Sequence, residues 1–417
     1  MKSSSASIKV FIVLLCITAF FYSMIGNGYI LLALSLVPVV HKIISCFSKK
    51  VKLSASWLTF IFLAVLSTAL SPVTEDSYKF IFMLIAYLLV KLVLENESGW
   101  QPFFAKTVYI FTSIVIIATF LSVLAPDFML SLAERFYSGR ALEVYLQLFR
   151  SEAYPGIYGQ TSVNGYFISI FIALLVSNIF NNQKKTLSYV LLILAVIALF
   201  LTQKRSFLVG NVLAAFILFW RNTLSDKNKI RKMLTLAVIV VIIYFIILYH
   251  PATQGLVEKM AALENADDVS NGRLASWEMT IEIWKTSPLL GVGTNALVNV
   301  YGLSSHNVYL QVLAEMGIFG ACAYIFLLAS TLKQSLHTYG QLLQEPAFTQ
   351  KNKAIAGTSI YMQVLLIVYS FFGNPLYDIM FMLPYTLFVA AMGAYNRTYL
   401  RRDEMYENRN PDVPQHP

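Results

Sequence analysis

Long apolar runs recur along most of this chain and constrain its fold more than any other feature of the sequence. Repeated runs of about 17 to 25 residues match the length that a helix needs to cross a bilayer core of roughly 30 Å. Short polar or basic stretches separate them, and only 13% of the residues are charged, about half the share of a soluble domain. Because a backbone in lipid must satisfy its own hydrogen bonds, the runs predict membrane-spanning helices.

The pattern therefore predicts an all-α membrane protein with about twelve transmembrane helices. We place the spans at residues 8–24, 29–47, 53–71, 80–94, 104–125, 166–180, 187–203, 208–220, 233–249, 308–332, 354–374 and 381–395. The first run could be mistaken for a signal peptide, but it has no small-residue cleavage site and no soluble domain after it. We interpret it as the first span.

The distribution of basic residues predicts the orientation. If the N-terminus is cytoplasmic, 22 of the 31 lysines and arginines fall on the cytoplasmic side. This asymmetry follows the positive-inside rule and predicts that both termini are inside. The net charge of +9 is then explained by anchoring against anionic membrane lipid, and it requires no nucleic-acid partner.

Two outward segments, about 126–165 and 250–307, are too long to be simple turns. The second lies between the ninth and tenth spans and contains amphipathic stretches, among them Leu274 to Lys285, that predict short helices. We therefore expect one polytopic domain over residues 1–395, these two loops included, and a short basic cytoplasmic tail over 396–417.

Lys204 and Arg205 stand between two apolar runs that together cover only residues 187 to 220. Thirty-four helical residues reach about 51 Å, whereas two full crossings need roughly 60 Å. The turn is therefore expected to be recessed, which makes its cations candidates for an anion-binding site. Alternatively, both side chains extend to the outer lipid headgroups.

Arg273 follows Gly272 and precedes Trp277 and the glycine-rich turn Gly291-Val292-Gly293. Taken alone, an arginine in a polar loop is usually a solvated surface charge. The two glycines follow no predicted strand, so they indicate a tight turn rather than a nucleotide-binding loop.

His306 lies in Ser304-Ser305-His306-Asn307, directly before an apolar helix. Ser304 or Ser305 is a candidate N-cap, which would place the imidazole in the first helical turn. There the helix dipole would favour a neutral ring that can accept a proton. The alternative is an interfacial histidine bonded to a carbonyl.

Glu315 lies on the same predicted helix as His306. Nine residues at 100° each put the two on opposite faces, about 13 Å apart along the axis. We therefore expect Glu315 to be a structural partner in an ion pair or hydrogen bond. The cysteines and the other histidines show no metal-ligand spacing, so no metal site and no cofactor are predicted.

These residues together resemble the O-antigen ligase and polymerase superfamily. The resemblance rests first on Ser305-His306-Asn307 followed by Gly317. Before this motif, Gly272-Arg273, Trp277, Pro288 and Gly291-Val292-Gly293 occur in the order that the family shows, and Arg205 stands at the outer start of a span. Gly159 and Asn164 match a shorter signature of the family. The specific motifs occupy about 50 residues, from 271 to 320, together with Arg205.

The resemblance implies a helical GT-C type glycosyltransferase in the bacterial inner membrane with a periplasmic active site. By motif, Arg205 and Arg273 would bind the undecaprenyl pyrophosphate of an O-antigen donor, and His306 would assist the acceptor hydroxyl. Lys204, Asn307 and Asn164 are expected to support them. The acceptor would be lipid A-core, and the transfer would be inverting and independent of metal.

Three other functions remain open from the sequence. An O-antigen polymerase would use the same donor and a growing lipid-linked chain as acceptor. A protein oligosaccharyltransferase is less favoured because such relatives carry a larger periplasmic or C-terminal domain. A flippase for lipid-linked sugars would be expected to carry ionisable residues along many spans, whereas the outward charges here gather near one face. The oligomeric state is left open.

Overall fold

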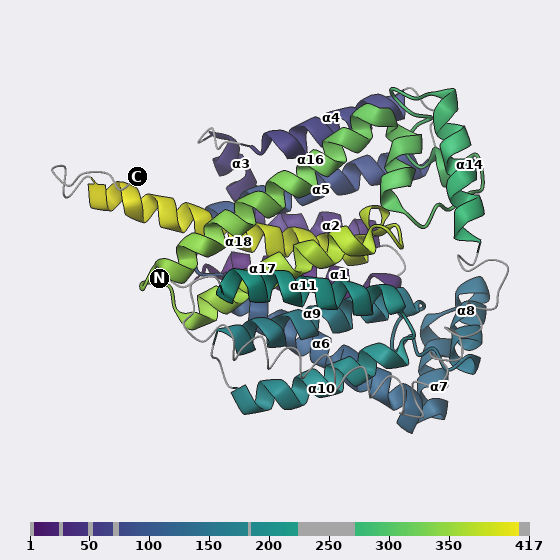
Figure 1. Ribbon diagram of the computed structural model, residues 1–417, viewed down its shortest axis with the longest axis horizontal. Helices are drawn as coiled ribbons and strands as arrows, with labels where there is room; N and C mark the ends of the chain where they lie inside the picture. The colour runs from purple at the N-terminus through teal and green to yellow at the C-terminus, as the bar shows by residue number, and fades with distance from the viewer. Residues whose placement is uncertain are drawn as a thin grey trace.

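The computed structural model of this chain describes residues 4–24, 28–48, 53–69, 75–181, 185–223 and 272–407, and its regular elements within these ranges are all helical (Figure 1). The helices are α1 (Ala6–Phe21), η1 (Tyr22–Met24), α2 (Gly28–Leu36), η2 (Val37–Val39), α3 (Val40–Ser48), α4 (Ala55–Ala69), α5 (Glu75–Asn96), α6 (Gln101–Leu124), α7 (Pro126–Phe136), α8 (Gly139–Arg150), α9 (Thr161–Phe180), α10 (Lys185–Leu201), α11 (Arg205–Thr223), α14 (Arg273–Thr286), α15 (Ala296–Asn299), α16 (Val308–Gln344), α17 (Gln350–Tyr369), η3 (Pro375–Tyr377) and α18 (Ile379–Glu407).

The apolar runs fold as the sequence predicts. Eight helical stretches in the described residues are long and apolar enough to cross a membrane, and α4 and α10 are shorter apolar helices. Together with α17, these helices overlap eleven of the twelve predicted spans, of which eight are long and apolar enough to cross a membrane. The remaining one, 233–249, lies outside the described residues.

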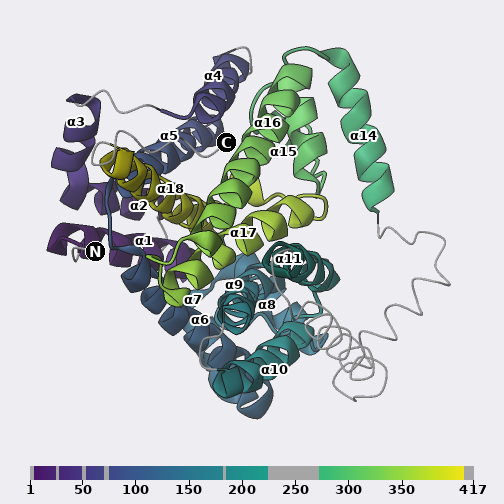
Figure 2. The same ribbon diagram turned by 60° about the vertical axis from the view of Figure 1, so that its left-hand side comes forward.

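Three helices form the centre of the bundle. In the most apolar stretches of α9 and α18, 83% and 94% of the residues are buried inside the protein, against 22% for the stretch Gly28–Ser48. α17 packs against both central helices, and Figure 2 shows the remaining helices arranged around them. The outer helices expose large apolar side chains such as Phe62 and Leu34, as expected where lipid replaces water.

Buried polar side chains fix α11 to this centre. The Asn211 amide donates to Ser169 Oγ on α9 at 2.7 Å. Tyr361 on α17 donates its hydroxyl hydrogen to the Asn211 side chain at 2.9 Å. In an apolar surrounding each unmade hydrogen bond is costly, so these contacts define how α11 is rotated. The rotation of α11 in turn positions its first residue, Arg205.

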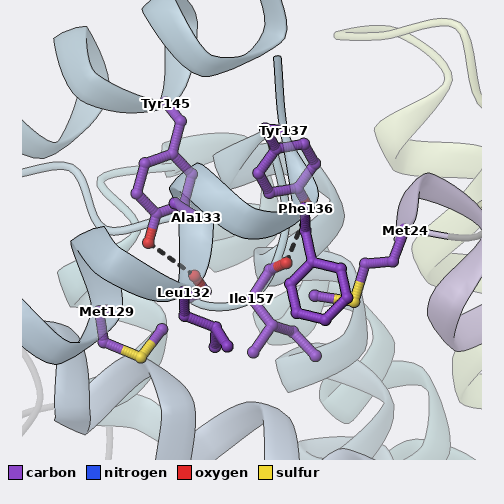
Figure 3. A pocket seen from close by; sticks show the side chains of 9 residues that line it. Met24, Met129, Leu132, Ala133, Phe136, Tyr137, Tyr145 and Ile157 are labelled. Carbon is purple, nitrogen blue, oxygen red and sulfur yellow. Dashed lines mark hydrogen bonds between the residues drawn. The ribbon is translucent and has the colours of Figure 1, made fainter.

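Helices α7, α8 and α14 lie at one end of the bundle, and the last described part of α18 extends from the other (Figure 1). The α7–α8 hairpin is fixed by two tyrosines, because Tyr137 donates to the Ile157 carbonyl at 2.8 Å and Tyr145 to the Gly156 carbonyl at 3.0 Å. The two rings and neighbouring apolar side chains, among them Met129 and Phe136, line a small pocket (Figure 3). The segment 126–165, predicted to face outward, is therefore folded around a helical hairpin at this end of the bundle. At the opposite end, α18 continues past residue 395 to Glu407.

Candidate active site

The start of α16 is capped by Asn307. Its side-chain oxygen accepts hydrogen bonds from the Tyr309 and Leu310 backbone amides at 3.0 and 3.2 Å. Ser305 is buried and bonds the backbone of Asn307 instead. The prediction that Ser304 or Ser305 caps this helix is therefore wrong, because the Asn307 side chain satisfies the free amides.

His306 lies outside the helix rather than in its first turn. Its φ of 49° is in the left-handed region, which costs energy for a residue with a Cβ and persists only where the surroundings impose it. The bonds of Ser305 and Asn307 on either side supply that constraint. The imidazole is thus presented from a rigid turn, and the residue is exposed.

Trp277 ties α14 to this turn. Its indole Nε1 donates to the Ser305 carbonyl at 2.9 Å, directly before His306. Arg273 begins α14 and lies four residues before Trp277, so both project from the same face of the helix. The side of α14 that carries Arg273 therefore faces the His306 turn. The helix predicted near Leu274 to Lys285 is confirmed as α14, but its side chains are not divided into an apolar and a polar face as the prediction assumed.

Lys204 lies in the turn between α10 and α11, and Arg205 is the first residue of α11. The turn is joined to the first outward segment, because Tyr154 N donates to the Leu201 carbonyl at 2.9 Å and the Gln203 amide to the Glu152 carbonyl at 3.1 Å. Both cations are partly buried. Among the described residues, no carboxylate lies within 4.0 Å of Arg205 or Arg273.

The pKa of His306 is lowered from its ordinary value. Loss of water around the ring is the largest cause, and the positive charges of Arg273 and Lys204 add to it. A neutral imidazole at pH 7 was predicted, but from the helix dipole rather than from these charges. Arg205 is not among the charges that act on the ring. Lys204, which was predicted to be a supporting residue, is the member of the Lys204–Arg205 pair whose charge lowers the pKa of His306.

A kink in α16 is built from contact between two backbone segments. Gly317 has a φ of 65°, and a Cβ there would lie 2.2 Å from the Leu289 carbonyl carbon. Gly291 has a φ of 75°, and a Cβ there would lie 2.3 Å from the Glu315 carbonyl carbon. The glycine-rich turn is therefore a tight turn, as predicted, and it packs directly on the kink.

The kink frees backbone groups of α16, and the glycine-rich turn satisfies them. Val292 N donates to the Ala314 carbonyl at 3.0 Å, and Gly293 N to the Glu315 carbonyl at 2.8 Å. In the other direction, Ile318 N donates to the Pro288 carbonyl at 2.9 Å. Such pairing is required for backbone groups away from water. It holds the segment after α14 against α16.

We predict that Gly317→Ala destabilises the protein by about 2 to 4 kcal/mol, since left-handed strain and a backbone clash act together. The midpoint of thermal unfolding in detergent measures this. Gly139→Ala is the control, because Gly139 also has a positive φ but has nothing within 4 Å of a Cβ. Equal losses in the two variants would show that the contact with Leu289 contributes nothing.

Glu315 is fully buried. Among the described residues it forms hydrogen bonds but no ion pair. Its carboxylate accepts from Tyr377 Oη at 2.6 Å, Asn295 N at 2.9 Å and Gln311 Nε2 at 3.1 Å. The prediction that Glu315 is a structural partner is confirmed, and the contacts are hydrogen bonds rather than an ion pair. The carboxylate joins α16 to η3 and to the segment before α15, and His306 is not one of its partners.

Residues 190–325 match a family model described as O-antigen ligase. This segment is therefore similar to the O-antigen ligase family. It runs from α10 into α16 and contains Lys204, Arg205, Arg273 and His306. The family covers O-antigen ligases and polymerases, which are glycosyl-transfer enzymes of bacterial membranes. A search of curated proteins found no match.

Asn164 lies before the O-antigen ligase family segment and is completely buried. Its amide donates to Thr119 Oγ1 and to the Tyr154 carbonyl, both at 3.0 Å. These bonds fix the end of the first outward segment, which in turn holds the Lys204 turn. Asn164 therefore supports the family segment through the backbone.

Tyr377 and Asn295 were missed by the sequence analysis. Both bond Glu315 from segments that are distant from it in the chain. The only signal was the intramembrane carboxylate itself, which requires partners. The sequence does not indicate which residues provide them.

Proposed function

We propose that this chain is an O-antigen ligase. It transfers O-antigen polysaccharide from undecaprenyl pyrophosphate to lipid A-core at the periplasmic face of the bacterial inner membrane, and it does so as a GT-C type enzyme. The observation that carries the proposal is the match of residues 190–325, which contain Lys204, Arg273 and His306, to the O-antigen ligase family model, and the positive charges of Arg273 and Lys204 act on the His306 ring. A proton acceptor beside cations suits the joining of a hydroxyl to a sugar pyrophosphate.

In the proposed reaction, the acceptor hydroxyl oxygen attacks the anomeric carbon of the donor sugar. The bond from that carbon to the pyrophosphate oxygen breaks, and its electron pair leaves with the pyrophosphate. Direct displacement inverts the anomeric centre. Neutral His306 takes the hydroxyl proton or orients the hydroxyl through a hydrogen bond.

The cations stabilise the departing pyrophosphate. Each guanidinium of Arg205 and Arg273 can form paired hydrogen bonds with phosphate oxygens, and Lys204 adds a third charge. Charge that develops on the leaving group is neutralised by groups already in position. We therefore expect transfer to proceed without a divalent metal.

An O-antigen polymerase would use the same donor site, and gene deletion separates the two functions. Without the ligase, cells should accumulate polymerised O-antigen on undecaprenyl pyrophosphate beside unsubstituted lipid A-core. Without a polymerase, single repeats should be attached to lipid A-core. The second result would overturn the proposed ligase activity.

The fall of kcat/KM at the acidic side of its pH profile, the acidic limb of the profile, reports the pKa of His306 in the enzyme without bound substrate. Because that pKa is lowered, activity should fall with acidification only below about pH 6.5, the ordinary histidine value. Removing a nearby positive charge raises the pKa, so Lys204→Gln should move the limb to higher pH. The pH dependence of kcat/KM in both proteins measures this. An unmoved limb would show that Lys204 does not act on the titrating group.

A further inference from the structure

An open hollow lies between α14 and the segment that leads to His306. Its volume is about 630 Å³, and its lining includes Glu278, Met279 and Glu282 from α14 and Tyr301 and Leu303 from the opposite wall. This volume is within the range of about 300 to 1,000 Å³ that is usual for small-molecule sites. The reaction described above leaves the hollow without a role.

The walls of the hollow are fixed by hydrogen bonds. Leu303 N donates to the Leu297 carbonyl at 3.0 Å, and Tyr301 N to the Ala296 carbonyl at 3.2 Å. Ala296 and Leu297 are themselves buried in the protein. On the other side, the bond from Trp277 to Ser305 holds α14 in place. The hollow is thus preformed, and its Leu303 wall lies three residues before His306.

The charge of the hollow is opposite to that of the pyrophosphate site. Glu278 is exposed and has no cation within 4.0 Å among the described residues, whereas Glu282 pairs with Lys285 at 2.6 Å. The cations Arg273 and Lys204 act on His306 instead. Carboxylates repel phosphate and anionic lipid headgroups, so the hollow suits an uncharged or basic polar ligand.

The side chains combine apolar surface with hydrogen-bond acceptors. Tyr301 is 47% exposed and Met279 is 55% exposed, so both offer apolar area to a ligand. The Glu278 carboxylate can accept hydrogen bonds from hydroxyl groups. A sugar ring presents both kinds of surface, a face of C–H groups and a rim of hydroxyls.

We propose that this hollow binds an uncharged or basic sugar residue next to the reacting centre, with the ring against Tyr301 and hydroxyls donating to Glu278. The inference rests on the proposed function, because the sugar comes from the donor or the acceptor glycan. A sugar bound in the hollow positions the rest of its glycan chain beside His306. The charged groups of that substrate stay on the side of Arg273.

Kinetics of glycan transfer test the subsite. Losing the ring contact in Tyr301→Ala should raise KM for one glycan by about three- to tenfold at nearly unchanged kcat. Glu278→Gln removes a charged acceptor and should raise the same KM by about tenfold. Tyr301→Phe keeps the ring, and Glu143→Gln changes an exposed carboxylate on α8, so both controls should match the unmodified protein.

The substrate whose KM changes identifies the source of the sugar. A higher KM for the lipid-linked donor assigns the subsite to the donor glycan, and a higher KM for lipid A-core assigns it to the acceptor. Unchanged KM values for both substrates in Tyr301→Ala and Glu278→Gln would overturn the proposal and leave the proposed ligase activity intact.

Direct binding separates failure of the subsite from failure of the proposed function. Soluble oligosaccharides corresponding to the O-antigen repeat and to the core are titrated into the purified full chain and observed by ligand NMR. If the protein shows no transfer but binds one oligosaccharide, and Tyr301→Ala removes that binding, the subsite stands without the ligase assignment. Absence of binding to either oligosaccharide in a protein that also shows no transfer would overturn both.

Discussion

Replacing His306 with alanine should lower kcat by about 10²- to 10⁴-fold, the usual contribution of a positioned proton acceptor. The residue is exposed, and the Asn307 cap next to it does not depend on the imidazole. The variant should therefore fold, and its thermal unfolding midpoint should not fall. The loss is expected in kcat and kcat/KM together, because the interaction with the proton forms in the transition state.

His337→Ala is the matched control. His337 lies on α16, the helix that begins two residues after His306, is also exposed, and is about 30 residues, or roughly 45 Å, from the start of that helix. Its replacement should leave kcat unchanged. If His306→Ala kept full turnover, His306 would have no part in moving the proton.

Replacing Arg273 with alanine should lower kcat/KM by about 10²- to 10³-fold, as expected when a group that stabilises transition-state charge is removed. Arg273 stands at the start of α14 on the face that Trp277 holds against the His306 turn. Arg273→Lys keeps the charge but loses the paired hydrogen bonds, so its loss should be intermediate.

The Arg273 variants have a second readout in the pH profile. Arg273→Ala should raise the pKa of His306, because the guanidinium charge lowers it in the intact protein. The acidic limb of kcat/KM should then move to higher pH. Arg140→Ala, at an exposed position of α8, removes the same charge and should change neither rate nor pH profile. If Arg140→Ala and Arg273→Ala had equal effects, net charge rather than position would explain the loss.

The helices were predictable because their signals are local. A run of apolar residues long enough to span a bilayer needs no tertiary information. A helix near Leu274 to Lys285 was also predicted correctly, although α14 does not have the separate apolar and polar faces that the prediction assumed. The position of His306 was not predictable in the same way. Ser304, Ser305 and Asn307 are all good N-caps, and only packing against α14 and α17 selects Asn307.

The detailed electrostatics of the site depend on contacts between distant segments. Lys204 and Arg205 are adjacent in the sequence, but Lys204 precedes α11 and Arg205 is its first residue. The charge of Lys204 contributes to the lowered pKa of His306, and this effect depends on where the buried bonds of Asn211 hold the start of α11. Likewise, the sequence indicated a tight turn at Gly291 but not its contact with the α16 kink at Gly317.

The central claim is that this chain alone joins a lipid-linked polysaccharide to lipid A-core. The direct test combines the purified protein in detergent or nanodiscs with undecaprenyl pyrophosphate-linked O-antigen and lipid A-core, with a chelator and without nucleotide. We predict lipid A-core carrying the polysaccharide, formed by the unmodified protein and by His337→Ala but not by His306→Ala. Longer lipid-linked chains with lipid A-core left unchanged would contradict the claim and identify a polymerase.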